Sequence, residues 1–138
     1  MEKKLVCTLA VLMIISGVAF SQSKKTVKEK KISSTTVHEY FLGEGMKKPV
    51  VESIEKFNEN GDLIEIQAFN KKGEVKKWEK YSYDSDGNLE EEVFMDTKGR
   101  VTLTEKNIYQ DGLRIEKQYY NTRGDLYKKK VYKYDYHE

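Results

Sequence analysis

The sequence predicts an all-β protein: an open, twisted antiparallel meander of repeated β-hairpins with about seven or eight strands. Glycine recurs at a nearly constant interval, and each interval holds one short segment rich in aromatic or β-branched residues and in Lys and Glu. Helices are disfavoured, because each glycine inside a helix would cost about 1 kcal/mol. The turn glycines are Gly61, Gly73, Gly87, Gly99, Gly112 and Gly124, at intervals of 12, 14, 12, 13 and 12 residues.

Composition agrees with one small domain. The chain has 138 residues, and its 25 Lys and Arg residues nearly balance its 23 Asp and Glu residues, which gives a net charge of +2. This balance argues against a strongly basic nucleic-acid binder and against an acidic disordered tail. Charged residues make up 35% of the chain, but aromatic residues make up 12%, which is more than a disordered chain carries.

Residues 1–21 have the layout of a secretory signal peptide. Two lysines precede an apolar run over 5–20, and that run is at or below the roughly 17–25 residues needed to span a bilayer. Ala19 and Ser21 stand at the −3 and −1 positions of a cleavage site. An uncleaved N-terminal anchor is the alternative. Cys7 lies near the start of the run, where it does not suit a lipoprotein.

Cleavage after Ser21 would leave a chain without cysteine, and therefore without a disulfide, a thiol nucleophile or a thiolate metal ligand. Export without cysteine suggests a bacterial periplasmic, cell-surface or secreted protein, with no stable membrane insertion after cleavage. Residues 22–31 carry five Lys and one Glu, and are expected to form a solvated, flexible basic arm. Residues 32–138 form the predicted β-hairpin repeat domain.

The position of each glycine predicts which residues pair across the strands. A glycine that follows a polar residue suits the left-handed position of a three-residue hairpin loop, a type I turn followed by a G1 bulge. The residue four before the glycine then faces the residue two after it. The shorter unit around Gly112 is expected to keep Tyr109 opposite Leu113. The other predicted pairs are Phe57–Leu63, Phe69–Val75, Tyr83–Leu89, Met95–Val101 and Tyr120–Leu126.

These pairs are expected to form two apolar rows, one near each end of the strands. A first hairpin should turn at 43–45, with Pro49 at the start of a strand, where its missing N–H is tolerated. On the same face as the rows, and between them, we expect Glu65, Lys77, Glu79 and Glu91. Strands are expected near 32–42, 49–57, 62–70, 74–83, 88–95, 100–109, 113–120 and 125–135.

One phrase of the repeat carries a family resemblance. The segment Tyr81-Ser-Tyr-Asp-Ser-Asp-Gly-Asn-Leu89, followed by Met95-Asp-Thr-Lys-Gly99, resembles the YD-repeat (RHS-repeat) family over roughly residues 50–138. The resemblance implies an extended β-structure on a secreted or surface protein, and some members are described as carbohydrate-binding. In size the chain is similar to small exported bacterial proteins made almost wholly of such repeats.

No residue pattern indicates a catalytic or metal site. Asp84 and Asp86 resemble the start of a calcium loop, but position twelve is Met95 where a Glu is needed. Asp in this place also stabilises a turn by bonding the local backbone. His38 and His137 are far apart in the sequence and are expected at the surface. We therefore predict no catalytic residues, no metal ligands and no cofactor.

Aromatic residues are the candidates for binding, because exposed rings on a sheet can stack on sugars or anchor a protein. The competing interpretation is that these rings fill cross-strand rows of a thin sheet. Lys128–Lys130 and the arm at 24–31 are candidates for contact with anionic lipid or glycan, although lysine on a last strand commonly blocks aggregation. The candidate binding residues are Trp78, Tyr81, Tyr83, Tyr119 and Tyr120.

The hypothesis that follows is an exported, non-enzymatic repeat protein that acts as a binding module at the cell envelope. Its expected partner is an envelope polysaccharide or another envelope protein. The alternative is an inhibitor or immunity protein that binds a toxin, or another protein, by strand addition to a sheet edge. A hydrolase that uses paired carboxylates is a third and weaker interpretation.

Overall fold

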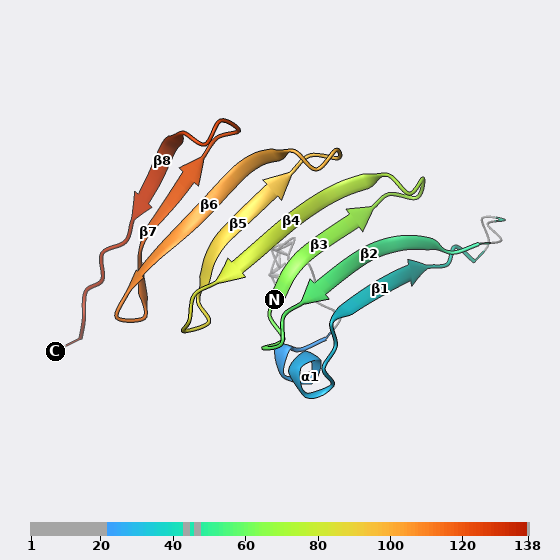
Figure 1. Ribbon diagram of the computed structural model, residues 1–138, viewed down its shortest axis with the longest axis horizontal. Helices are drawn as coiled ribbons and strands as arrows, with labels where there is room; N and C mark the ends of the chain where they lie inside the picture. Colours follow the sequence, from blue (N-terminus) through green and yellow to red (C-terminus); the bar gives the residue numbers. More distant parts are fainter. Residues whose placement is uncertain (1–21, 43–44, 46–47, 138) are drawn as a thin grey trace, which may run out of the picture.

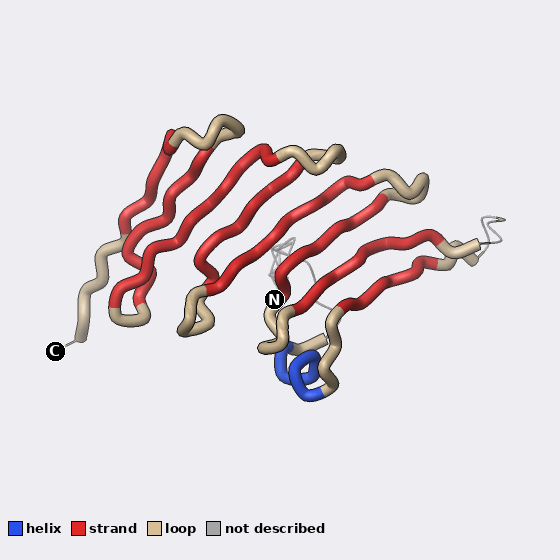
Figure 2. The backbone as a smooth tube through the Cα atoms, in the orientation of Figure 1, coloured by secondary structure: helices blue, strands red, loops and turns tan. Residues whose placement is uncertain are grey.

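The computed structural model describes residues 22–42, 45 and 48–137, so the predicted signal peptide and the predicted turn glycine Gly43 lie outside the described residues. Eight antiparallel strands form one open sheet in chain order (Figures 1 and 2), which confirms the predicted fold class. No helix in this described part of the chain has the length and apolar character needed to cross a membrane. The elements are α1 (Lys24–Glu29), β1 (Ser34–Glu39), β2 (Val50–Phe57), β3 (Leu63–Phe69), β4 (Val75–Tyr83), β5 (Leu89–Met95), β6 (Val101–Gln110), β7 (Leu113–Tyr120) and β8 (Leu126–Val131).

The β2–β3 hairpin shows how the repeated turn is built. The Asn58 N–H donates to the Asp62 carbonyl at 2.9 Å, and the Gly61 N–H donates to the Asn58 carbonyl at 3.0 Å. Gly61 has a φ of 80°, which a residue with a side chain rarely adopts. The β3–β4, β4–β5, β5–β6 and β7–β8 turns repeat both hydrogen bonds. The pairs predicted for these five hairpins are all confirmed.

The β6–β7 hairpin differs from the prediction. Asp111 and Gly112 both have positive φ, 52° and 75°, as in a two-residue type I′ turn. Gln110 therefore pairs with Leu113, and Tyr109 pairs with Arg114 rather than with Leu113 as predicted. This loop contains two residues, Asp111 and Gly112, instead of the three in the other turns. Strand pairing therefore begins at Gln110 and Leu113, and the partner of Tyr109 becomes Arg114.

A β-bulge recurs in the returning strand of each of the last six hairpins. In β3, for example, Phe57 pairs with Leu63 and Lys56 pairs with Glu65, so Ile64 is left without a partner in β2. Because a bulge adds one residue, it reverses the side to which the next side chains point. The extra residue always lies three after the turn glycine: Ile64, Lys76, Glu90, Thr102, Ile115 and Tyr127.

Because of the bulges, the prediction that the charged residues share one face is wrong. Past the bulge, Glu65 pairs with Lys80 and the next residue, Ile66, pairs with Glu79. Glu65 and Glu79 therefore lie on opposite faces, and Glu65, Lys77, Glu79 and Glu91 do not share one face. We call the face that carries Phe57, Leu63, Ile66 and Glu79 face A, and the opposite face, which carries Glu65, face B.

Three tyrosines hydrogen-bond to backbone carbonyls beside the bulges. The Tyr83 hydroxyl donates to the Leu63 carbonyl at 2.8 Å, and the Tyr109 hydroxyl donates to the Leu89 carbonyl at 3.1 Å. Tyr134 donates in the same way to the Arg114 carbonyl. In each case the acceptor lies 20 residues earlier and directly before the extra residue of a bulge. The repeat thus supplies a donor where the bulge interrupts the strand pairing.

The segment predicted to be a solvated, flexible arm instead includes helix α1. Ser23 caps the helix by accepting a hydrogen bond from the Thr26 N–H, and Val27, only 1% exposed, packs in the cluster of Phe57, Leu63 and Ile66. Burying a valine side chain stabilises by about 1.5–3 kcal/mol, which outweighs the lysines because these stay in solvent. All five lysines of residues 22–31 are exposed.

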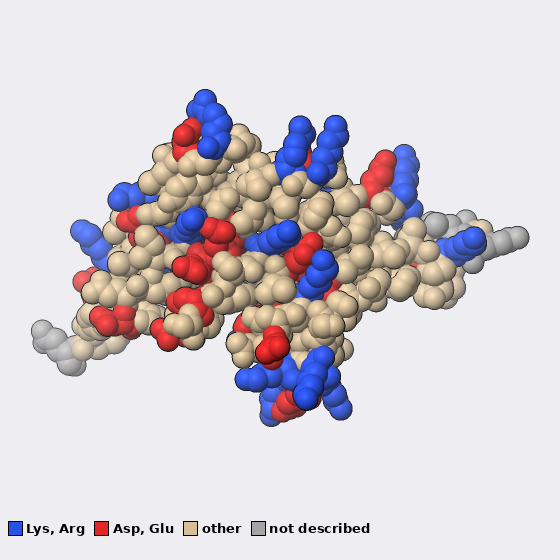
Figure 3. Space-filling view, in the orientation of Figure 1, with Lys and Arg blue, Asp and Glu red and all other residues tan. Residues whose placement is uncertain are grey.

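Basic and acidic side chains are interspersed over the face of the molecule seen in Figure 3. On face B, Lys56 lies 3.1 Å from Glu65. On face A, the neighbouring strands β5 and β6 place Glu92 opposite Glu105, which is unfavourable for like charges. Lys117 resolves this repulsion, because its Nζ lies 3.4 Å from the Glu92 carboxylate and 2.5 Å from the Glu105 carboxylate.

Candidate functional site

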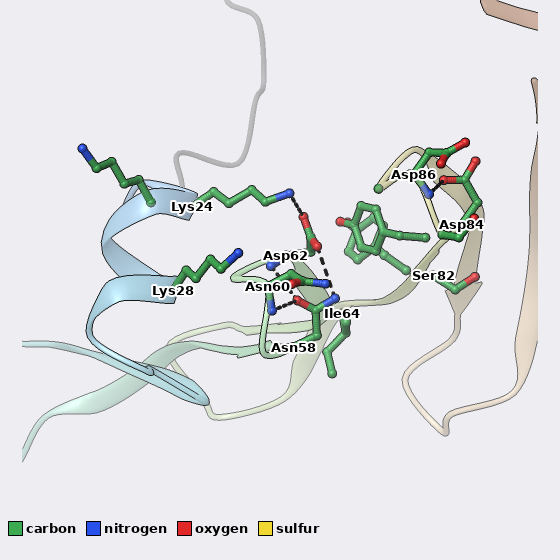
Figure 4. Close-up of a pocket in the computed structure, with 14 residues that line it drawn as sticks. Lys24, Lys28, Asn58, Asn60, Asp62, Ile64, Ser82, Asp84 and Asp86 are labelled. Atoms are coloured by element: carbon green, nitrogen blue, oxygen red, sulfur yellow. Dashed lines mark hydrogen bonds and ion pairs between the residues drawn. The ribbon is translucent and has the colours of Figure 1, made fainter. Parts of the chain in front are cut away.

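The candidate site is an open groove of about 880 Å³ at the end of the sheet next to α1 (Figure 4). Its walls are α1 with the β2–β3 turn and the β4–β5 turn, and residues of β3 and β4 complete its lining. Both turns lie at the same end of the sheet because alternate hairpins turn at the same end (Figure 1). The groove is lined by Lys24, Lys25, Lys28, Asn58, Asn60, Asp62, Ile64, Tyr81, Ser82, Tyr83, Asp84, Ser85, Asp86 and Gly87.

The first wall joins α1 to the β2–β3 turn. Asp62 is only 7% exposed, and its carboxylate lies 2.5 Å from the Lys24 Nζ. The Asn58 side chain organises the turn by accepting from the N–H groups of Asn60 and Asp62 at 3.0 and 2.9 Å. A side chain at Gly61 would place its Cβ 2.5 Å from the Lys24 carbonyl, so this glycine also permits the helix to approach. Lys28 projects from the same side of the groove (Figure 4).

The second wall is the β4–β5 turn. The Asp84 carboxylate accepts from the N–H groups of Asp86 and Asn88 at 2.9 and 2.8 Å, and from the Asn88 side-chain amide at 3.0 Å. The side-chain and backbone hydrogen bonds from Asn88 lower the pKa of Asp84 below its usual value. Asp84 is therefore a fixed, ionised carboxylate at neutral pH, and its turn role is the one that its position in the repeat predicts.

Two tyrosines of β4 line the groove between these walls. Tyr83 donates to the Leu63 carbonyl, and Tyr81 donates to the Glu79 carboxylate. Burial is the largest cause of their raised pKa values, followed by the nearby Asp62 for Tyr83 and by the hydrogen bond to Glu79 for Tyr81. The pKa of Tyr83 is raised to about 12. Both phenols stay neutral at physiological pH and present rings with hydroxyls already bonded to the protein.

The groove therefore combines a lysine-bearing wall, a carboxylate-bearing wall and phenol rings. Amide, hydroxyl and carboxylate groups at its rim can exchange hydrogen bonds with a hydroxyl-rich ligand, and a ring can stack on a sugar's C–H face. The turns hold Asn58 and Asp84 through their own backbone hydrogen bonds, so both walls are organised before a ligand arrives.

The five candidate binding residues are not brought together. Tyr81 and Tyr83 line the groove on face A, but Trp78 lies on face B, where its indole N–H donates to Glu65 at 3.0 Å. Trp78 also packs over the β5–β6 turn, because a Cβ at Gly99 would lie 2.9 Å from its ring. This close contact gives Trp78 a structural role, although the residue lies outside the repeated pattern of turn glycines, and no ligand is needed to account for it.

Tyr119 and Tyr120 lie on β7, away from the groove. Tyr119 is 6% exposed, and the Lys128 Nζ lies 3.8 Å from its ring centre. Tyr120 donates its hydroxyl to the Gln118 side chain at 2.5 Å. Tyr119 is buried and Tyr120 does not line the groove, so neither ring shares a binding surface with Tyr81 and Tyr83.

Sequence reasoning missed the α1 wall. The sequence predicts that Lys24 and Lys28 belong to a solvated, flexible basic arm, whereas in the structure they line one side of the groove. Two signals for the helix were present: Ser23 in an N-cap position, and Val27 as an isolated apolar residue among lysines.

Comparison with protein-family models gives no match to this chain, and comparison with curated proteins gives none either.

Proposed function

We propose that this chain is an exported, non-enzymatic binding module of the cell envelope, and that its groove holds a short stretch of envelope polysaccharide. The observation that carries the proposal is the placement of Tyr81 and Tyr83 between two hydrogen-bonded polar turns. The export part of the proposal rests on the signal-like residues 1–21, and the repeat phrase supports membership of the YD-repeat family.

The groove's acidic groups support a binding role over hydrolysis. A general acid needs a pKa raised toward neutrality. Hydrogen bonding instead lowers the pKa of Asp84, and Lys24 pairs with Asp62. These carboxylates hold the turns in place, which argues against the hydrolase hypothesis.

The groove proposal is tested by measuring the binding of the purified protein to isolated peptidoglycan, capsular polysaccharide and teichoic or lipopolysaccharide fractions. Tyr81→Leu keeps an apolar side chain but removes the ring, and should weaken binding about tenfold, as expected for loss of one stacking contact. Tyr127→Leu is the matched control, because Tyr127 is 57% exposed on β8 and lies outside the groove.

Equal binding by Tyr81→Leu and the native protein would contradict the groove proposal, as would a failure of every fraction to bind. An acidic polysaccharide would bind through Lys25 and Lys28, so Lys28→Glu and added salt should then weaken binding further. A neutral polysaccharide should show little response to salt.

A second candidate function is an inhibitor or immunity protein that binds another protein through a sheet edge. The observation in its favour is the exposed outer strand β8, whose six residues are all exposed. This edge is separate from the groove.

A further inference from the structure

The outer edge of β8 differs from every interior strand of the sheet. β8 pairs with β7 alone, so one side of its backbone has no strand partner within the described residues. An unpaired edge can accept an added strand through its main-chain groups.

The pairing of β8 shows which backbone groups face outward. The Tyr132 N–H donates to the Ile115 carbonyl of β7 at 3.0 Å. Successive residues of a strand direct their N–H groups to alternate sides. The N–H groups of Val131 and Lys129 therefore point away from β7, toward the free edge, where an added strand would bond them.

The side chains of β8 differ between the two faces of the sheet. Lys128 and Lys130 lie on the side of Tyr119, with their Nζ atoms 3.8 and 5.7 Å from its ring centre. Val131 lies on the opposite face, together with Lys129, and is 61% exposed. Lys129 has a carboxylate partner inside the chain, Glu116 at 3.3 Å.

We infer that the free edge of β8 binds an extended strand of a partner protein in which acidic and aliphatic residues alternate. In an antiparallel addition, the acidic side chains would lie beside Lys128 and Lys130, and the aliphatic ones beside Val131 on the other face. The interior of this sheet uses the same chemistry, because Lys106 and Glu91 of neighbouring strands lie 3.0 Å apart. This inference rests on the second candidate function, binding of a protein through a sheet edge, and does not depend on the groove.

Charge selects this occupant over a second copy of the chain. Two β8 edges paired with each other would place lysines beside lysines, and like charges across strands are destabilising. Lysine on an edge therefore prevents self-association, while the same side chains attract a strand of opposite charge. The other edge strand, β1, carries no lysine. An acidic strand is thus directed to β8.

The test is backbone hydrogen exchange measured by NMR on the purified protein, with a synthetic peptide of alternating valine and glutamate slightly longer than β8. The amides of Lys129 and Val131 should exchange fast in the free protein and become protected when the peptide is added. A peptide of alternating valine and lysine is the matched control and should leave both amides unprotected.

Two variants separate backbone pairing from attraction of charge alone. Val131→Pro removes an outward N–H and leaves the N–H groups that bond β7, so it should abolish the peptide-dependent protection. Lys128→Glu with Lys130→Glu should weaken peptide binding roughly tenfold. Lys72→Glu with Lys98→Glu makes the same charge change in the exposed β3–β4 and β5–β6 turns, outside β8, and should have little effect. A thermal unfolding midpoint close to that of the native protein confirms, for each variant, that the sheet is intact.

Peptide binding without protection of the Lys129 and Val131 amides would overturn the inference, because it would show electrostatic contact without strand addition. Peptide-dependent protection of the Lys129 amide that persists in Val131→Pro would also overturn it. The groove variant Tyr81→Leu should bind the peptide as the native protein does, so the outcome here is independent of the polysaccharide experiment.

Discussion

The hairpin repeat runs through both halves of the sheet, from β2 in the first four strands to β8 in the last four, but only the first four strands share an apolar cluster with a helix. There Val27 of α1 packs with Phe57, Leu63 and Ile66. In the described residues of β5–β8, Tyr119 is the only buried hydrophobic residue. The large aliphatic residues that are exposed on strands all belong to that second half: Val101, Ile108, Leu126 and Val131.

The difference teaches that the repeat itself specifies strand pairing but not a core. In the second half, stability comes from cross-strand contacts: Tyr109 on a bulge carbonyl, Lys117 between two carboxylates, and Lys128 over Tyr119. Such contacts are individually modest. We expect the two halves to respond differently to substitutions, and the following tests are ordered from the largest expected effect to the smallest.

Val27→Asp should destabilise the first four strands. A charge would be buried without a partner, so the free energy of unfolding should fall by about 3 kcal/mol. Hydrogen exchange should accelerate most in β2 and β3 and least in β7. Lys25→Asp, in the same helix but exposed, is the control and should have a small effect. Uniform acceleration along the whole sheet would contradict the separation of the two halves.

Lys117→Met should destabilise the last four strands. It leaves Glu92 and Glu105 facing each other, and should lower the free energy of unfolding at about pH 7 by about 1–3 kcal/mol.

The loss in Lys117→Met should shrink as the pH falls. The pKa of Glu92 is already raised, mainly by burial, and removing the Lys117 charge that opposes this shift raises it further. An acid with a raised pKa in the folded state stabilises when protonated, so this stability is present at low pH and is lost as pH rises. Denaturant unfolding at about pH 5 and pH 7 measures it. Lys129→Met, which removes the exposed ion pair with Glu116, should change the free energy of unfolding little at either pH.

Glu55→Gln should give the smallest effect, and in the opposite direction. Glu55 is buried on β2, one of its carboxylate oxygens has no hydrogen-bond partner, and burial raises its pKa. Replacing the carboxylate by a neutral amide should raise the free energy of unfolding by about 1 kcal/mol at neutral pH.

The pH dependence gives the sign of the Glu55 effect. Because the folded-state pKa is raised, the native protein gains stability from this group as the pH falls toward the ordinary glutamate value, and loses it as pH rises. Glu55→Gln should lack that contribution, so its advantage over the native protein should decrease from about pH 7 to about pH 5. An advantage independent of pH would contradict the assignment.

The glycine frame predicts strand pairing well because it depends on local geometry. Phe57–Leu63 and four further pairs follow from the three-residue loop alone. The further bulge three residues after each turn glycine could not be predicted, because residues as different as Ile64, Lys76 and Glu90 occupy the extra position. Without them, the side-chain faces beyond each turn are assigned wrongly.

The groove was only half predictable. Tyr81 and Tyr83 belong to the repeat and stood out as aromatic residues, but their partners come from α1. Composition assigned that segment to solvent because five lysines outnumber one valine. A single buried side chain decides the outcome when the charged neighbours can keep their ends in water.

The recurrent bulge has a consequence for how such a chain can change in length. Removing one strand of β3–β8 would reverse the direction of all later strands, and the tyrosine of that strand pair would lose its bond to the carbonyl 20 residues earlier. Removing or adding two strands at once restores direction, face and hydrogen bond together. Variation in length, whether natural or engineered, is therefore expected in steps of one strand pair.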